Sequence, residues 1–177
     1  MAKLRPAACY RKAKRPYTRV SRYREISYVK GVPGMRVRKF DMGNPSGEFP
    51  WTIEVIIKEG IQIRHNALEA FRTSANKNLE KRLGKKNYHL KLKLYPHQIM
   101  RHNPRANFAG ADRFSSGMKH SFGKPLGRSA IVKKGQVLSF TRVNSEKDVK
   151  AVKESLKIAV QRLPCKCSLE IKKPYNK

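Results

Sequence analysis

Residues 51–84 read WTIEVIIKEGIQIRHNALEAFRTSANKNLEKRLG, and both regular secondary-structure periods occur in this one stretch. Apolar and polar residues alternate over residues 51–57 and 61–63, which predicts two strands joined by a turn. From residue 66 the apolar period becomes helical, and Gly84 supplies a C-terminal stop. The buried face of this helix is predicted to contain Leu68, Phe71, Ala75, Leu79 and Leu83.

Further strands are expected on both sides of this scaffold. In residues 88–95, Tyr and Leu alternate with His and Lys, so one face should pack inward and the other should be cationic. Shorter or weaker strand patterns occur at residues 37–40, 97–100, 129–132, 137–143 and 165–171.

A second helix is predicted to begin after Ser145, with Asp148 in the capping-box position, and to end at Pro164. Its buried stripe is Val149, Val152, Leu156, Val160 and Leu163. A row of lysines beside the stripe is either a solvated face or a phosphate-binding ridge: Lys147, Lys150, Lys153 and Lys157. The whole pattern predicts one α+β domain, residues 25–177, which contains a long loop at 102–127 and follows a basic arm at 1–24.

The charge is one-sided, because 41 Lys and Arg against 12 Asp and Glu give +29 over 177 residues. Residues 40–80 hold 4 basic and 6 acidic side chains, a net −2. Residues 1–39 hold 13 basic against 1 acidic (+12), and residues 81–134 hold 14 against 1 (+13). This distribution is typical of a folded body that presents basic segments to a polyanion. A membrane is the weaker partner, because no apolar run approaches the roughly 20 residues of a spanning helix.

The two cationic regions have different characters. Residues 1–24 are aperiodic and carry Tyr10, Tyr17 and Tyr23 among their Arg and Lys, so we expect this arm to order only against its partner, with tyrosines available for base stacking. Residues 102–127 lose apolar periodicity and combine Gly, Phe, Arg and Lys, which suits insertion into a folded RNA. The alternatives are a solubilising tail and a solvent-exposed loop.

The sequence gives little support for a catalytic role of this loop. Five residues separate Gly117 from Gly123 where a P-loop has four, and Pro125 stands in the metal-binding position. Ser115 or Ser116 with His120 and Asp112 matches no nucleophile motif, so the sequence predicts no enzyme.

No cofactor or metal site is predicted either. The three cysteines, Cys9, Cys165 and Cys167, form no Cys-x-x-Cys spacing, which favours free thiols in a reducing, cytosolic compartment. The histidines lack metal-ligand spacing as well. The one metal left open is structural Mg²⁺ held together with an RNA partner.

Several motifs give the chain a family resemblance. They are Arg5-Pro-Ala-Ala-Cys-Tyr-Arg11, Gly31-Val-Pro33, Lys39-Phe-Asp-Met-Gly43, Ala109-Gly-Ala-Asp-Arg113, Gly117-Met118 and Phe122-Gly-Lys-Pro125. In this order they resemble the large-subunit ribosomal proteins known as L16p in bacteria and L10e in archaea and eukaryotes. The C-terminal length is similar to that of archaeal members.

The resemblance implies an α/β hammerhead-type fold, with two helices packed on a mixed, largely antiparallel sheet. It implies a structural, non-enzymatic protein of the cytoplasmic ribosome that binds large-subunit rRNA between the central protuberance and the peptidyl-transferase region. Proximity to 5S rRNA, to transfer RNA and to neighbouring ribosomal proteins is also implied. The loop near the peptidyl-transferase region would begin with His102, Asn103, Pro104, Arg105, Ala106, Asn107, Phe108, Ala109, Gly110, Ala111 and Asp112.

Charge and resemblance together predict a set of RNA-binding side chains, and two other classes of protein remain as alternatives. The set is Arg5, Arg11, Lys12, Lys14, Arg15, Arg19, Arg22, Arg24, Lys91, Lys93, Arg101, Arg105, Arg113, Lys119, Lys124 and Arg128. An architectural DNA-binding protein would share the charge, although no helix-turn-helix or basic-zipper pattern occurs. An RNA-modifying enzyme would need a cofactor motif that the sequence lacks.

Overall fold

Residues 51–83 form the two strands and the helix that their apolar periodicity predicts. The structure is a computed structural model, and it describes residues 4–12, 17–18, 22–27, 29, 31–103 and 123–172. Its elements in chain order are η1 (Ala7–Tyr10), η2 (Arg24–Ile26), β1 (Asp41–Gly43), β2 (Trp51–Ile57), β3 (Ile61–Arg64), α1 (His65–Leu83), β4 (Tyr88–Leu92), β5 (Gln98–His102), β6 (Lys124–Val132), β7 (Val137–Val143), α3 (Glu146–Val160) and β8 (Cys167–Lys172).

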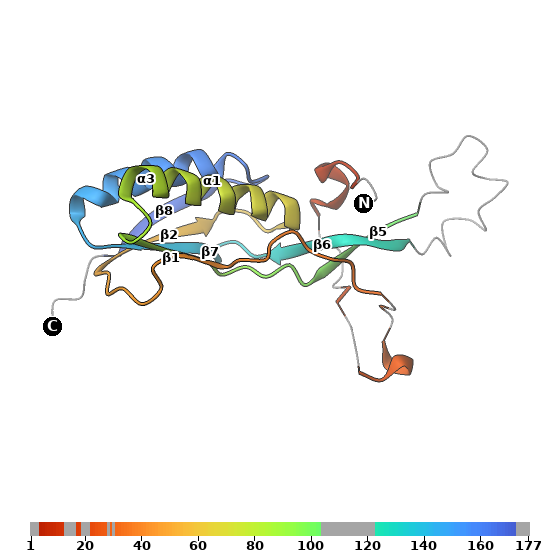
Figure 1. Cartoon of the computed structure of the whole chain (residues 1–177). Coiled ribbons are helices and arrows are strands. Elements are labelled where there is room, and N and C mark those ends of the chain that lie inside the picture. Colours follow the sequence, from red (N-terminus) through yellow and green to blue (C-terminus); the bar gives the residue numbers. More distant parts are fainter. Residues whose placement is uncertain are drawn as a thin grey trace.

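The described strands form two antiparallel sheets. One has the order β1-β4-β7-β2-β8, and the other has the order β3-β6-β5. Helices α1 and α3 pack against each other and lie over one face of the five-stranded sheet, while β5 and β6 extend away from the helix layer (Figure 1). This arrangement confirms the predicted α+β fold with two helices on a largely antiparallel sheet.

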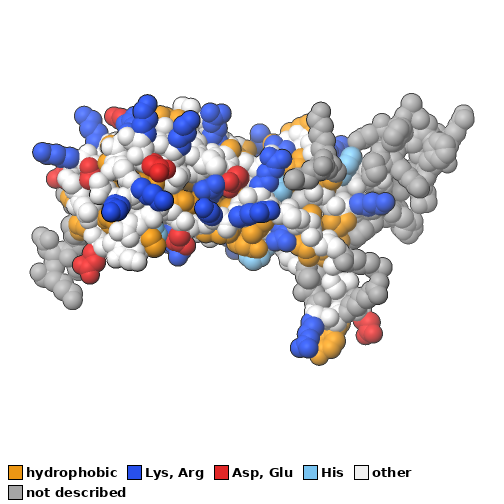
Figure 2. Space-filling model, in the orientation of Figure 1, with side chains coloured by type: hydrophobic (Ala, Val, Ile, Leu, Met, Phe, Trp, Pro, Cys, Tyr) orange, Lys and Arg blue, Asp and Glu red, His pale blue; other side chains and the backbone are white. Residues whose placement is uncertain are grey.

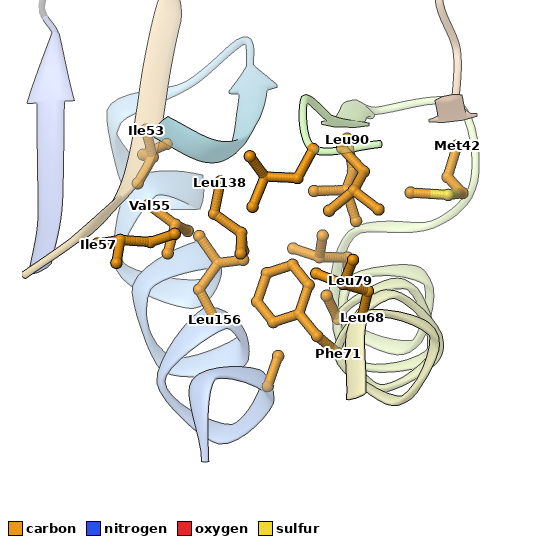
Figure 3. Close-up of a cluster of buried hydrophobic side chains, with 14 of the residues drawn as sticks. Met42, Ile53, Val55, Ile57, Leu68, Phe71, Leu79, Leu90, Leu138 and Leu156 are labelled. Carbon is orange, nitrogen blue, oxygen red and sulfur yellow. The ribbon is translucent and has the colours of Figure 1, made fainter. Parts of the chain in front are cut away.

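The main core lies between the five-stranded sheet and the two helices. Phe71 and Leu79 of α1 and Leu156 of α3 meet Ile53 and Leu90 of the sheet (Figure 3). All five side chains are at most 1% exposed. Burial of these side chains supplies about 25 cal/mol for each Å² of apolar surface removed from water, which is why this layer holds the rest of the fold in place.

The second helix begins as predicted. The Ser145 hydroxyl accepts a hydrogen bond from the Lys147 N–H (3.3 Å), and Glu146 and Asp148 place negative charge in the first turn. Arg82 at the end of α1 forms an ion pair with Glu154 of α3, so the two helices are joined at their exposed edge as well as by their buried stripes.

Several predicted boundaries are wrong. Helix α3 ends at Val160 and not at Pro164, and strand β4 ends at Leu92 and not at residue 95. The short strand lies at β1, residues 41–43, and not at 37–40, because β4 ends at Leu92 and leaves residues 37–39 without a ladder partner. Residues 124–127, assigned to the loop, begin strand β6, and His102 ends β5. A register shift between Met100 and Arg101 breaks the alternation of this hairpin, so local periodicity did not show it.

His89 also differs from its predicted place on an open cationic face. It is only 6% exposed, and its Nε2 lies 3.1 Å from the Asp41 carboxylate. The Phe140 ring packs edge-on against the imidazole at 5.7 Å between centroids. Cross-strand neighbours on β1 and β7 therefore cover a side chain that the sequence pattern assigns to solvent.

The turn after β1 gives a first testable prediction. Gly43 has φ +82°, and a Cβ there would overlap the Tyr88 carbonyl oxygen. We expect Gly43→Ala to lower the free energy of unfolding by about 2–4 kcal/mol in urea denaturation. The strain of a positive φ and the steric clash with the Tyr88 carbonyl both destabilise the folded state. Gly135→Ala is the matched control: Gly135 has φ +83° but open space around it, so strain alone should cost about 1 kcal/mol. Equal losses in both variants would show that the clash contributes nothing.

Candidate nucleic-acid interface

Most of the described candidate RNA-binding residues lie around the three-stranded sheet. Arg101 and Lys124 are exposed on β5 and β6, and Arg5, Arg11 and Lys12 flank η1, which contacts β3. Lys91 and Lys93 lie at the five-stranded sheet, and Arg22 precedes η2. The remaining candidates lie outside the described residues or have undescribed side chains: Lys14, Arg15, Arg19, Arg24, Arg105, Arg113, Lys119 and loop residues 104–112.

Backbone and side-chain hydrogen bonds fix the described part of the arm to this sheet. The Gln62 N–H donates to the Arg11 carbonyl (3.0 Å), and Arg64 Nη1 donates to the Arg5 carbonyl (2.8 Å). The Tyr10 hydroxyl donates to the Arg101 carbonyl (3.2 Å). These contacts place the arginines of residues 5–11 beside β3 and β5. Whether the arm orders only with a partner stays a prediction.

Tyr17 is used for packing and not as an open stacking face. It is 7% exposed and forms a small cluster with Val29 and Ile99. Its N–H donates to Gln98 Oε1 (2.7 Å), and its carbonyl accepts from the Ile99 N–H (3.1 Å). The Arg101 guanidinium carbon lies 4.2 Å from the centroid of the Tyr17 ring, so the ring also positions a cation on β5.

Arg128 links a connecting segment to the sheet. Its Nε donates to the Pro33 carbonyl (2.7 Å), and its Nη1 lies 3.3 Å from the Tyr95 hydroxyl. Part of this guanidinium is therefore engaged within the protein, which gives Arg128 a positioning role in addition to any contact with RNA.

The outer face of the five-stranded sheet carries a mixed set of charges. Lys91 Nζ lies 3.3 Å from Asp41, and Lys93 Nζ lies 5.3 Å from the centroid of the Phe140 ring. Arg142 stacks on the same ring at 4.8 Å. An acidic partner thus engages Lys91, and an aromatic ring engages Lys93 and Arg142.

A basic cavity at the start of α1 was not found by sequence reasoning. It has a volume of about 860 Å³ and is lined by Leu4, Pro33, Gly34, Met35, Arg36, Arg38, Arg64, His65, Asn66 and Leu126. Residues 33–38 belong to the basic segment 1–39, whereas residues 64–66 belong to the nearly neutral segment 40–80. Counting charge by segment therefore separated side chains that the fold brings together. No local spacing could have joined them.

His65 forms the inner wall of this cavity and is 4% exposed. Burial lowers its pKa, and the nearby Arg36, Arg128 and Arg64 lower it further. The ring is therefore neutral at pH 7. Its Nδ1 accepts a hydrogen bond from the Arg36 N–H (3.2 Å), which places the ring proton on Nε2.

The described residues present no candidate metal centre. No group of three or more His, Cys, Asp or Glu in this part of the chain could hold a metal ion. Cys9, Cys165 and Cys167 are free thiols, and the last two sulfurs are 3.9 Å apart. Ser115, Ser116, Asp112 and His120 lie outside the described ranges. No described helix is long and apolar enough to span a membrane.

Among the charged side chains on the visible surface, Lys and Arg predominate (Figure 2). Lys and Arg spread over the helix layer as well as the neighbouring sheet, with few Asp and Glu among them (Figure 2). On α3, Lys147, Lys150 and Lys157 are exposed and Lys153 is half-buried, so the predicted lysine row exists. Phosphate contact by this row stays a prediction.

Comparison with known proteins agrees with the motifs. A family model described as ribosomal protein L16p/L10e matches residues 12–170.

Proteins named large ribosomal subunit protein uL16 are similar over nearly the whole chain. The one from Archaeoglobus fulgidus is 44% identical over 172 residues, covering 97% of this chain and 95% of the relative. The one from Staphylothermus marinus is 46% identical over 162 residues, with 91% and 89% covered. The one from a Methanococcus maripaludis strain is 44% identical over 171 residues, with 96% and 95% covered. The chain therefore belongs to the ribosomal protein L16p/L10e family, whose members are structural components of the ribosome and not enzymes.

Proposed function

We propose that the protein is a structural constituent of the large ribosomal subunit in the cytoplasm and binds large-subunit rRNA between the central protuberance and the peptidyl-transferase region. In that position it lies close to 5S rRNA and to neighbouring ribosomal proteins, and it helps to shape the path of transfer RNA. It needs no cofactor of its own, and Mg²⁺ at the interface is associated with the RNA.

One observation carries this proposal: cations from distant parts of the sequence converge around the three-stranded sheet. Arg5 and Arg11 are held there by hydrogen bonds to β3, and Arg101 and Lys124 extend from β5 and β6. Guanidinium groups suit phosphate oxygens, and several of them on one surface release counterions together when RNA binds. Family membership supports rRNA as the polyanion.

The β5–β6 hairpin supports the role of the loop. His102 pairs with Lys124 at the end of the hairpin, so residues 103 and 123 leave the sheet side by side. This end lies far from the helix layer (Figure 1). Residues 103 and 123, where the chain leaves and re-enters the hairpin, thus lie at the end of the body away from the main core, which suits a segment that probes the RNA centre while the core stays outside it.

Competitive binding tests the proposal. We expect the full-length protein to bind large-subunit rRNA fragments at least about tenfold more tightly than duplex DNA of the same length at matched salt, because a folded RNA offers loops and unpaired bases in addition to phosphates. Gel-shift titrations over a range of salt concentrations give both affinities. Equal affinity for the two would contradict the proposal and favour an architectural DNA-binding protein.

A shortened loop separates assembly from function. We expect a variant lacking residues 103–107 to assemble into large subunits at nearly the wild-type level but to lower the rate of peptide synthesis several-fold, because strand β5 ends at His102, before this segment. Quantitative mass spectrometry of purified subunits and in vitro translation give the two readouts. A subunit that fails to incorporate the variant would show that the loop is an anchor.

A further inference from the structure

The basic cavity at the start of α1 contains cations that the protein leaves uncompensated. Neither Arg36 nor Arg38 has an ion-pair partner among the described residues, and no Asp or Glu lines the cavity. Arg64 contributes a third guanidinium, and its Nη1 donates to the backbone carbonyl of Arg5. Arg36 and Arg38 are exposed, so water solvates their charges in the free protein, and an anion bound in the cavity would be attracted by all three cations.

The helix terminus adds to the positive potential. Arg64 is the N-cap residue of α1, its side chain makes no cap hydrogen bond, and the first turn contains no acidic residue. The positive end of the α1 dipole therefore lies at this cavity, whose lining includes Arg64, His65 and Asn66.

The rest of the cavity wall is apolar, which an inorganic anion would not need. Leu4, Pro33, Met35 and Leu126 line it together with the neutral imidazole of His65. The described residues provide a hydrogen-bond partner for His65 Nδ1 and none for Nε2, so the Nε2 proton is available as a donor. A volume of about 860 Å³ is also far larger than one phosphate requires and falls within the usual range for small organic ligands.

We propose that this cavity takes one unpaired nucleotide of the bound RNA, with its phosphate between Arg36, Arg38 and Arg64 and its base against Met35, Leu126 and the His65 ring. The proposal rests on the proposed rRNA-binding function and names a subsite for it. Bases that leave a helix in folded RNA are recognised by apolar or aromatic walls and by hydrogen-bond donors at their edges, and both are present here.

An acidic protein segment is the competing occupant, and the surroundings favour RNA. Arg64 is bonded to the arm that carries Arg5 and Arg11, and Arg128 lies close to His65. The cavity is therefore continuous with the set of cations around the three-stranded sheet. A carboxylate of a partner protein would use the guanidinium groups but would leave the apolar wall without a function.

The first test uses the free full-length protein, with its methionine methyl groups labelled with ¹³C, and four probes: AMP, GMP, CMP and UMP. We expect the NMR signal of Met35 to shift and saturate in the millimolar range with at least one of them, which is the affinity expected for a single detached nucleotide. Met42, 8% exposed in the main core, is the internal control and should not shift. Inorganic phosphate should shift Met35 less than the nucleotides do, because it cannot reach the apolar wall.

The second test uses large-subunit rRNA and variants that separate charge from shape. Arg38→Gln should weaken rRNA binding about tenfold, whereas Lys86→Gln, which removes the same charge from the exposed turn after α1, should change it less than about twofold. The double variant Met35→Ala and Leu126→Ala keeps every charge, so we expect about tenfold weaker binding with an unchanged salt dependence. Urea denaturation verifies that each variant is folded.

The outcomes are distinct. If wild-type protein does not prefer rRNA to duplex DNA, the proposed function fails. If it does prefer rRNA, three results would each overturn the nucleotide subsite alone. These are a Met35 signal that responds to no nucleotide, a Met35 signal that shifts as far with inorganic phosphate as with the nucleotides, and a double variant that binds rRNA as tightly as the wild type. The NMR titration needs no variant, so it gives a decision even if a substitution prevents folding.

Discussion

Deleting residues 1–24 is expected to lower the affinity for large-subunit rRNA by about two to three orders of magnitude near physiological salt. The deleted segment carries nine Lys and Arg and no Asp or Glu. Each lost phosphate contact lowers the slope of log K against log salt concentration by roughly 0.9 for a duplex and 0.7 for a single strand. Gel-shift titrations at several salt concentrations should therefore show weaker binding with a flatter salt dependence.

The body should remain folded after this deletion. None of the described residues among 1–24 belongs to the main core cluster, which begins at Val37. The truncation does remove the packing of Tyr17 on Ile99 and the hydrogen bonds from β3 to the carbonyls of Arg5 and Arg11, so a modest loss of stability is expected. A full-length variant with Gln in place of the nine Lys and Arg keeps Tyr17 and should show a similar loss of affinity. Full affinity in that variant, or non-cooperative unfolding of the truncated protein, would contradict this account.

Phe71→Ala is expected to lower the free energy of unfolding by about 3–5 kcal/mol, a large part of the 5–15 kcal/mol typical of a domain. The Phe71 ring is 1% exposed and lies between α1, α3 and the five-stranded sheet (Figure 3), so its removal leaves a cavity that the rigid sheet cannot close. Urea denaturation followed by circular dichroism gives the change.

Lys77→Ala on the exposed side of α1 is the matched control and should change the stability by less than about 0.5 kcal/mol. Because the candidate interface lies outside this core, the folded fraction of Phe71→Ala should bind rRNA with wild-type affinity. A loss of less than about 1 kcal/mol would show that the site collapses around the smaller side chain.

The parts of the fold that local periodicity describes were predictable. Strand β2 has the predicted bounds, α1 buries Leu68, Phe71, Ala75 and Leu79 as expected, and Ser145 caps α3. In each case the signal is a repeat of 2 or 3.6 residues or a capping residue, and both act within a few residues of chain.

Features that depend on distant partners were not predictable from these signals. Strand β6 begins at Lys124 because it pairs with β5, and Tyr17 is buried because it meets Val29 and Ile99. The basic cavity needs residues 33–38 beside the start of α1, which no spacing in the sequence indicates. The charge of each segment was nevertheless predictable, because it depends on composition and not on strand pairing. The two strongly basic segments, 1–39 and 81–134, contain most of the cations that lie around the three-stranded sheet.

Co-sedimentation with the large ribosomal subunit tests the central claim most directly. Cells that express a tagged copy of this chain are lysed, and the ribosomal subunits are separated on sucrose gradients before and after a high-salt wash. A structural constituent held by many contacts should stay with the large subunit in stoichiometric amounts after the wash. Recovery at the top of the gradient, or with the small subunit, would contradict the account.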